Sequence, residues 1–291
     1  MLGAIEAGGT KFVCAVADMQ GQVVDRVRID TEAPEITMTK VFEFFDQYKL
    51  QSIGIACFGP INVDIDSDTF GQIGKSAKIL WRDFDFLGSV LNRYPGIAHY
   101  WTTDVNGSAY GEYQAGAAKN VDSCLYLTIG TGVGGGAVLK GNILENIRHP
   151  EMGHMRVIKH PKDLDFAGNC PVHQDCLEGM AAGPSIVVRY GVSGAELAED
   201  HEIWEIISDY IAQALVTYTY IIAPDKIIIG GGVAKQEQIL PMIREKFKQY
   251  NQDYLPIDDL EEYIVTPGLG DDAALVGCIE LAKKALNNSD Q

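Results

Sequence analysis

Short apolar runs dominate the first part of the chain and alternate with turns that contain glycine or polar residues. The runs LGAIEAGG, KFVCAVAD and QVVDRVRID have the length and spacing of strands, and they predict an antiparallel meander. Apolar side chains recur at helical spacing from Ile36 to Tyr48, which predicts an amphipathic helix. Two further strands are predicted at SIGIACFGP and at AHYWTTDVN, the second of which ends at Asp104. Residues 105–118 are rich in alanine, glycine and serine, which predicts a helix that packs closely against its neighbours.

The same order of elements begins again near residue 123. SCLYLTIGTGVGGGAVLKGNIL predicts strand, glycine turn, strand, turn and strand, and it matches the opening AIEAGGTKFVCAVADMQGQVV. This match indicates an internal duplication and therefore two related halves. A long helix is predicted from Glu202 to Ile222, followed by a buried strand in DKIIIGGGVA that leads through a triple-glycine turn into another helix. A last helical pattern runs from Asp271 to Leu286.

Composition narrows the class of protein. A chain of 291 residues suits two domains of ordinary size. No apolar run approaches the length of a membrane span, and the N-terminus lacks the features of a signal peptide, so we expect a cytoplasmic protein that does not bind membranes. Its cysteines should then stay reduced, and four of them lie in apolar stretches as expected for core thiols. The net charge of −17 disfavours nucleic acid as a partner.

Metal-ligating side chains gather between Glu151 and Glu178. Three of them have the spacing C-x2-H-x2-C, so one short loop can turn all three inward, and a nearby histidine can supply a fourth ligand. Zn²⁺ takes four nitrogen or sulfur ligands in tetrahedral sites, and four protein ligands leave no open position for catalysis. We therefore predict a structural zinc site; the alternative is a solvated loop with free side chains. The predicted ligands are His154, Cys170, His173 and Cys176.

Glycine turns follow predicted strands at three places along the chain. Glycine lets the backbone approach an anion closely, and successive N–H groups in such turns form anion-binding concavities. One glycine turn alone is more often ordinary turn chemistry, but three at strand ends favour a bound phosphate compound. None of them has the Walker A pattern or the dinucleotide-binding pattern. The turns are Gly8-Gly9-Thr10-Lys11, Gly130-Thr131-Gly132-Val133-Gly134 and Gly230-Gly231-Gly232.

These segments together resemble the ROK family of sugar kinases. The resemblance covers nearly the whole chain in the family's order, and it implies a two-domain α/β fold of the actin-like ATPase/hexokinase (ribonuclease H-like) class with a cleft between the domains. The usual metal loop of the family is C-x-C-x4-C, and the variant C-x2-H-x2-C resembles that of its bacterial fructokinases. The motifs that carry the resemblance are AIEAGGTK, GPINVD, TTDVNGSAYGE, TIGTGVGGG, EMGH, CLEGMAAGP and IIIGGGVA.

The resemblance implies roles for individual residues on the sugar side. Asp104 matches the general base, which accepts the proton of a sugar hydroxyl as its oxygen attacks the γ-phosphate of ATP. A plain helix N-cap is the alternative interpretation of Asp104. Thr103 stands where the family usually has asparagine, which puts one sugar hydrogen bond in doubt. His154 would contact the sugar through one ring nitrogen and zinc through the other. Besides Thr103 and Asp104, the implied sugar-binding residues are Gly59, Pro60, Glu151, His154 and Glu178.

The glycine turns are implied to hold ATP. The first turn should contact the β- and γ-phosphates, the second should cap them from the other half, and the third should let adenosine lie against the backbone. Mg²⁺ should bridge the phosphate oxygens, with Glu6 as a candidate ligand at a position where the family more often has aspartate. An exposed turn lysine remains the alternative for the lysine in this set. The implied nucleotide-binding residues are Gly9, Thr10, Lys11, Thr131, Gly132, Gly231 and Gly232.

We therefore predict an ATP-dependent hexose kinase, most simply a fructokinase, with mannose as a secondary substrate. A glucokinase, mannokinase or N-acetylhexosamine kinase of the same family is the alternative, and a sugar-responsive regulator or a binding module without activity is the alternative of another class. Domains are expected at 1–117 and 118–270, with the helix of 271–291 packing back on the first. Family resemblance implies a homodimer. Other histidines and aromatic residues are interpreted as packed residues, namely His149, His160, Tyr113 and Trp81.

Overall fold

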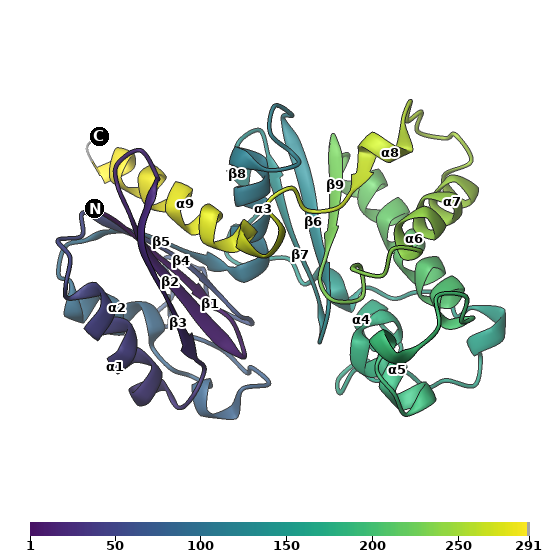
Figure 1. Ribbon diagram of the computed structural model, residues 1–291, viewed down its shortest axis with the longest axis horizontal. Coiled ribbons are helices and arrows are strands. Elements are labelled where there is room, and N and C mark those ends of the chain that lie inside the picture. Colours follow the sequence, from purple (N-terminus) through teal and green to yellow (C-terminus); the bar gives the residue numbers. More distant parts are fainter. Residues whose placement is uncertain (290–291) are drawn as a thin grey trace.

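The first five strands form one mixed sheet in the computed structural model, which describes residues 1–289 (Figure 1). Its strand order is β3-β2-β1-β4-β5. The first three strands are antiparallel neighbours, as the meander of apolar runs predicts, and β4 and β5 continue the sheet parallel to β1. The strands are β1 Leu2–Ala7, β2 Lys11–Ala17, β3 Val23–Asp30, β4 Ser52–Cys57 and β5 Ala98–Thr103.

The last five strands form a second sheet with the order β10-β9-β6-β7-β8. Read from its opposite edge, this order is that of the first sheet, with the same antiparallel meander and the same parallel additions. The internal duplication predicted from the sequence is therefore confirmed. The strands are β6 Ser123–Ile129, β7 Val133–Leu139, β8 Asn142–Ile143, β9 Lys226–Gly230 and β10 Ile264–Val265.

Helices cover the outer face of each sheet (Figure 1). On the first sheet, α1 (Pro34–Phe45) and α2 (Phe86–Arg93) enclose a core in which the ring of Phe12 lies 5.3 Å from that of Trp81. Trp81 is fully buried, as interpreted from the sequence, whereas α2 was not predicted. The helices of the second half are α4 Leu177–Ala181, α5 Gly183–Tyr190, α6 Ile203–Ile222, α7 Ile239–Asn251 and α8 Leu260–Tyr263.

The long apolar helix α6 is the centre of the second core. Trp204 and Tyr210 of this helix have no exposed surface and pack with residues of β6 and β9. The predicted helix over 202–222 is thus confirmed nearly to the residue. The helix predicted after the triple-glycine turn begins only at Ile239, because turns occupy the residues between.

Two helices lie between the sheets and pack on each other. They are α3 (Asp104–Ala115) and α9 (Ala273–Ser289), and α9 follows a single 3₁₀ turn at Gly270–Asp272. A side chain at Gly111 would overlap the backbone of α9, and one at Gly277 would overlap the backbone of α3. These glycines allow the close helix contact that the composition of residues 105–118 predicts. Residues 290–291 of the predicted last helix lie outside the described residues.

The chain crosses between the two sheets at 116–122 and again at 266–272. After the second crossing, Leu275, Cys278 and Ile279 of α9 join a core cluster with residues of β1 and β2. We propose the division 1–117 and 118–270, with α9 added to the first lobe, on the basis of these crossings. None of the helices within residues 1–289 is long and apolar enough to cross a membrane.

Candidate active site

A cavity of about 320 Å³ lies where the two sheets and the two central helices meet. It brings together residues that the sequence places in separate motifs, including the predicted base and the lysine of the first glycine turn. Glycine backbone from the third turn forms another part of the wall. The lining residues are Glu6, Lys11, Asp104, Val105, Ser108, Tyr126, Thr128, Gly231, Gly270, Asp271, Ala273 and Ala274.

Asp104 is the first residue of α3, so the helix begins at the cavity. Helix capping falls to Thr103, whose hydroxyl oxygen accepts a hydrogen bond from the backbone N–H of Asn106 at 3.2 Å. The interpretation of Asp104 as the N-cap is therefore wrong by one residue. Its own carboxylate accepts a bond from the N–H of Val105 at 2.9 Å. Burial, with a smaller contribution from the charge of Glu151, raises the pKa of Asp104 to about 6.

Glu6 lies at the end of β1 on the same cavity. Burial raises the pKa of Glu6 to about 7; the charge of Lys11 opposes this shift, and that of Asp104 adds to it. The Oε2 atom of Glu6 is buried and has no hydrogen-bond partner. A buried carboxylate oxygen without a partner is costly unless a cation or a donor of the ligand completes it.

The first glycine turn joins β1 to β2 and is held by the end of β3. Thr31 donates its hydroxyl to the carbonyl of Gly8 at 2.7 Å and its N–H to the carbonyl of Thr10 at 3.0 Å. The Cε atom of Lys78 lies 3.3 Å from the position that a Cβ on Gly9 would take. A second lysine besides Lys11 therefore lies over this turn, and its isolated position in the sequence gave no signal.

The second and third glycine turns lie side by side at the ends of β6 and β9. Gly231 has a φ of +90°, and the N–H of Val233 bonds to the carbonyl of Ile129 at 2.9 Å. A side chain on Gly231 would overlap the backbone of Ile129, so glycine is required there. Gly231 also lines an adjoining cavity of about 520 Å³ between β9 and α7.

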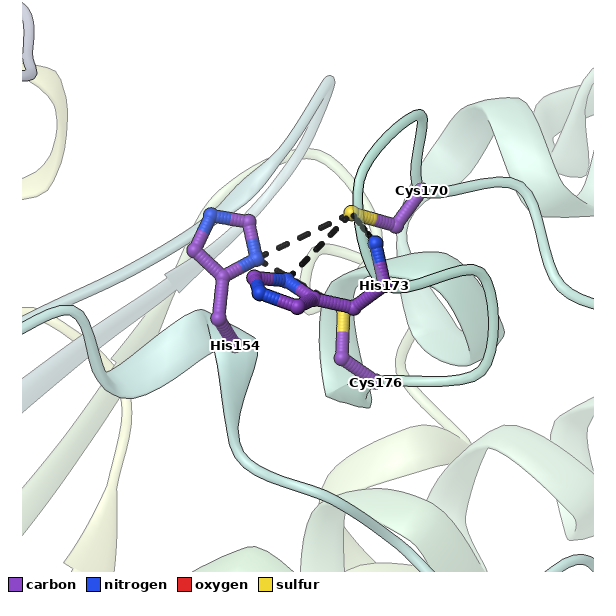
Figure 2. A group of neighbouring side chains, drawn as sticks. All are labelled: His154, Cys170, His173 and Cys176. Carbon is purple, nitrogen blue, oxygen red and sulfur yellow. Dashed lines mark hydrogen bonds between the residues drawn. The ribbon is translucent and has the colours of Figure 1, made fainter.

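Four metal-ligating side chains converge beside this region, as Figure 2 shows. Their ligand atoms lie within 4.8 Å of one another. The Nδ1 atom of His154 is 3.5 Å from Sγ of Cys176 and 3.8 Å from Sγ of Cys170. Zinc–ligand bonds of 2.0–2.3 Å in a tetrahedron give nitrogen–sulfur edges of about 3.6 Å. The four side chains of His154, Cys170, His173 and Cys176 thus form a group that could hold a metal ion, with two nitrogen and two sulfur ligands.

A tight backbone turn aims the loop ligands inward. The N–H of Gln174 bonds to the carbonyl of Cys170 at 3.0 Å, and the N–H of Cys170 bonds back to the carbonyl of Gln174 at 3.2 Å. A side chain on Gly179 would overlap that carbonyl of Gln174. Glycine is therefore required at position 179 of α4, because a larger residue would prevent the loop from folding against this helix.

The predicted sugar-binding carboxylates lie at two different depths. Oε2 of Glu178 accepts a hydrogen bond from the N–H of Val133 at 3.0 Å, so Glu178 supports the second glycine turn. The side chain of Glu151 is 53% exposed and lies 3.6 Å from Nδ1 of His149. Neither lines the cavity that contains Asp104.

Two residues near the site escaped the sequence analysis. Glu145 accepts hydrogen bonds from Tyr100, Thr102 and Asn106 of the first lobe. His149, interpreted as a packed residue, accepts a hydrogen bond on Nε2 from the N–H of Ile61 at 3.3 Å. Asn106 belongs to a motif that the sequence analysis singled out, but Glu145 lies in an ordinary loop and carries no motif.

A larger cavity, of about 690 Å³, lies between residues 155–161 and helices α6 and α7. It contains none of the predicted catalytic, sugar-binding or nucleotide-binding residues. Volume alone therefore does not identify the site, whereas the convergence of carboxylates, lysine and glycine turns does.

Comparison with known proteins shows the family to which this chain belongs. The model of the ROK family matches residues 2–285, and the chain belongs to this family. A fructokinase of Pediococcus pentosaceus is 49% identical over 289 residues, which cover 99% of this chain and 100% of that protein. A putative fructokinase of Bacillus subtilis (strain 168) is 46% identical over 98% of this chain and 96% of its own length.

Solved structures agree on the fold. A ROK hexokinase from Thermus thermophilus superimposes with a TM-score of 0.78 at 23% identity, covering 100% of this chain and 99% of that one. A ROK family glucokinase from Streptomyces griseus, in complex with glucose and AMPPNP, gives a TM-score of 0.71 at 23% identity, covering 96% and 98%. The predicted α/β fold of the actin-like ATPase and hexokinase class is confirmed.

Proposed function

We propose that this protein is a fructokinase, which transfers the γ-phosphoryl group of ATP to the 6-hydroxyl of fructose. The observation that carries the proposal is the position of Asp104 at the helix start, in a cavity with Lys11 and between the glycine turns. Relatives named fructokinase at 42–49% identity support fructose over other hexoses. Glucokinase relatives are more distant, at 28% and 24% identity.

The reaction needs alignment and charge neutralisation more than covalent chemistry. The Asp104 carboxylate accepts the proton of the sugar hydroxyl while that oxygen forms a bond to the γ-phosphorus. The bond from this phosphorus to the bridging oxygen breaks, and ADP leaves with the electron pair. Lys11 and the N–H groups of the first glycine turn bind the charged phosphate oxygens.

The nucleotide lies along the three glycine turns in this proposal. Gly9, Thr10 and Lys11 contact the β- and γ-phosphates, and Lys78 adds a second cation over the same turn. Thr131 and Gly132 cap the phosphates from the second lobe. Adenosine then occupies the adjoining cavity of about 520 Å³, where Gly231 and Gly232 let it approach the backbone; Gly231 lines both cavities.

Magnesium accompanies ATP and neutralises part of its phosphate charge. The partnerless Oε2 of Glu6 fits a ligand of this ion or of its water, since it lies on the cavity with Lys11 and Asp104. Glu6 would hold the ion on the side of β1.

Zinc is the metal we propose for the Cys₂His₂ cluster, because mixed thiolate and imidazole ligands at tetrahedral spacing suit it. His154 ligates through Nδ1, the atom that faces the thiols, and keeps Nε2 for a sugar hydroxyl. Glu151, Thr103 and the Gly59-Pro60 turn complete the sugar site, and Glu178 acts there or through the second glycine turn. The cytoplasmic location and the homodimer remain predictions.

The test is ADP release measured with fructose, glucose, mannose, N-acetylglucosamine and N-acetylmannosamine on protein of known zinc content. We expect the highest kcat/KM with fructose and lower turnover with mannose. A clear preference for glucose or an N-acetylhexosamine would contradict fructose as the substrate but would still support the proposed kinase activity. No turnover with any sugar in zinc-loaded protein would contradict the proposed activity.

A further inference from the structure

Residues 145–151 of the second lobe reach across to the first lobe at two points. At one end, the carboxylate of Glu145 accepts hydrogen bonds from Thr102 Oγ1 at 2.8 Å and from Asn106 Nδ2 at 3.1 Å. Tyr100 donates a third bond to this carboxylate at 3.2 Å. These partners lie on β5 and α3, on either side of Asp104. The segment is therefore anchored to the element that carries the proposed base.

His149 makes the second crossing, near the other end of the segment. Its Nε2 accepts a hydrogen bond from the backbone N–H of Ile61, which directly follows the Gly59-Pro60 turn. Its Cε1 lies 3.8 Å from the position that a Cβ on Gly59 would take. The side chain is only 9% exposed, so the ring is held between the two lobes.

The partners of His149 define its tautomer. Because Nε2 accepts the Ile61 N–H, the ring proton is on Nδ1. Nδ1 lies 3.6 Å from Oε1 of Glu151, so the N–H faces that carboxylate. One ring thus links a backbone group of the first lobe to a sugar-binding carboxylate of the second lobe.

We propose that His149 is a positioning residue for the sugar site, which fixes Glu151 relative to the Gly59–Ile61 turn. This inference rests on the proposed function. A carboxylate that is 53% exposed has many rotamers, and a donor on one side restricts them before the sugar binds. A histidine that served packing alone would not need a hydrogen bond to one lobe on Nε2 and a carboxylate of the other lobe 3.6 Å from Nδ1.

The test compares His149→Phe and His149→Gln with the wild-type protein. Phenylalanine keeps a ring of similar size but loses both polar contacts, and glutamine can restore one of them. We expect His149→Phe to raise the KM and the calorimetric Kd for fructose by roughly 10- to 100-fold, with the KM for ATP within about threefold. The KM and Kd of His149→Gln for fructose should lie between those of the wild type and those of His149→Phe. The midpoints of thermal unfolding of both variants should stay within a few degrees of the wild-type value.

His201→Gln is the matched control. Nδ1 of His201 also accepts a backbone N–H, that of Ile203 at 3.2 Å, but His201 lies outside the cavity with Asp104. Its kinetic constants should equal those of the wild type.

Two outcomes would overturn the inference. One is a fructose KM and Kd of His149→Phe within about twofold of the wild type. The other is a parallel loss of stability and of affinity for both substrates, which would indicate a structural role; if His149→Phe does not fold, the same criteria apply to His149→Gln. Wild-type protein without hexose turnover would instead contradict the proposed function, and the direct fructose titration separates the two failures.

Discussion

In the proposed reaction, the side chain of Asp104 lowers stability at neutral pH in order to serve as the base. Burial raises the pKa of Asp104 to about 6, so the folded protein holds this proton more tightly than the unfolded chain does. The associated stability is present at acidic pH and is lost as the pH rises through about 6. At neutral pH the ionised carboxylate therefore opposes folding, and this ionised form is the one that would accept the sugar proton in the proposed reaction.

Replacement of Asp104 by asparagine tests the expected effects of this carboxylate on both turnover and stability. We expect kcat to fall by about 10²- to 10⁴-fold, because the amide cannot accept the proton. The midpoint of thermal unfolding at pH 8 should rise, and this gain should shrink towards pH 4, where the wild-type carboxyl is also neutral. Circular dichroism melts at the two pH values and coupled ADP assays measure the two effects. Turnover close to wild type would remove Asp104 from the role of base.

The pH profile of the wild type follows from the same carboxyls. The pKa values of Asp104 and Glu6 are raised to about 6 and about 7, and the charge of Asp104 contributes to the shift of Glu6, so kcat/KM should fall on acidification below about pH 7. In the Glu6→Gln variant, the fall of kcat/KM at acidic pH should be governed by Asp104 alone. It should therefore occur at a lower apparent pKa than in the wild type. A flat kcat/KM from pH 5 to pH 8 would contradict the prediction.

Sequence motifs identified these residues but not their chemical state. Asp104 was singled out because it ends a predicted strand and matches the general base of the family that the sequence resembles. Its raised pKa depends on burial by both lobes, which no local pattern encodes. The contact of His149 could not be predicted for a similar reason, since its partner Ile61 lies 88 positions away.

At the scale of elements, segments with regular apolar periodicity were predicted well, whereas segments without regular secondary structure were not. The strands of both meanders and α6 follow from apolar spacing alone. The stretch between β4 and α2 depends instead on tertiary bonds, such as that from the indole N–H of Trp81 to the carbonyl of Glu32 at 2.8 Å. The metal loop is the exception, because ligand spacing constrained it without any secondary structure.

Metal removal tests whether a bound ion keeps this loop ordered and supports sugar binding. In the proposed site the four ligands bind one ion and hold the loop together with a tight turn, so its order should depend on the ion. We expect protein stripped with a zinc chelator to show an increased fructose KM and faster proteolysis between residues 159 and 175. The KM for ATP should change less, and added zinc should restore both properties. Metal-free protein with unchanged sugar kinetics would exclude a role of the ion in sugar binding.

At the scale of the whole molecule, the duplicated halves exchange their last helices. Helix α3 follows the first sheet but packs on β6 and β7, while α9 follows the second sheet and packs on β1 and β4. The halves are thus joined by a central helix pair and two crossing segments. The repeat predicted two related halves, whereas the hydrogen bonds that join the crossing segments could not be foreseen because their partners are 156 and 157 residues apart.

These bonds centre on Glu112, which has no exposed surface. Its carboxylate accepts the N–H of Ala117 at 2.6 Å in one crossing segment. It also accepts the N–H groups of Gly268 and Leu269, both at 2.9 Å, in the other. The next residues of the second segment, Gly270 and Asp271, line the cavity that contains Asp104.

We expect Glu112→Gln to loosen the junction between the lobes. The amide keeps one acceptor and turns N–H groups towards backbone N–H donors, so unfolding free energy should fall by about 2–4 kcal/mol. Because the junction borders the cavity proposed to bind both substrates, the KM values for fructose and ATP should rise together, unlike the selective effect expected for His149. Denaturant melts and steady-state kinetics measure the two effects. Glu196→Gln, an exposed carboxylate that also accepts a backbone N–H, is the control and should cost less than about 1 kcal/mol. Equal effects of the two variants would show that Glu112 does not join the lobes.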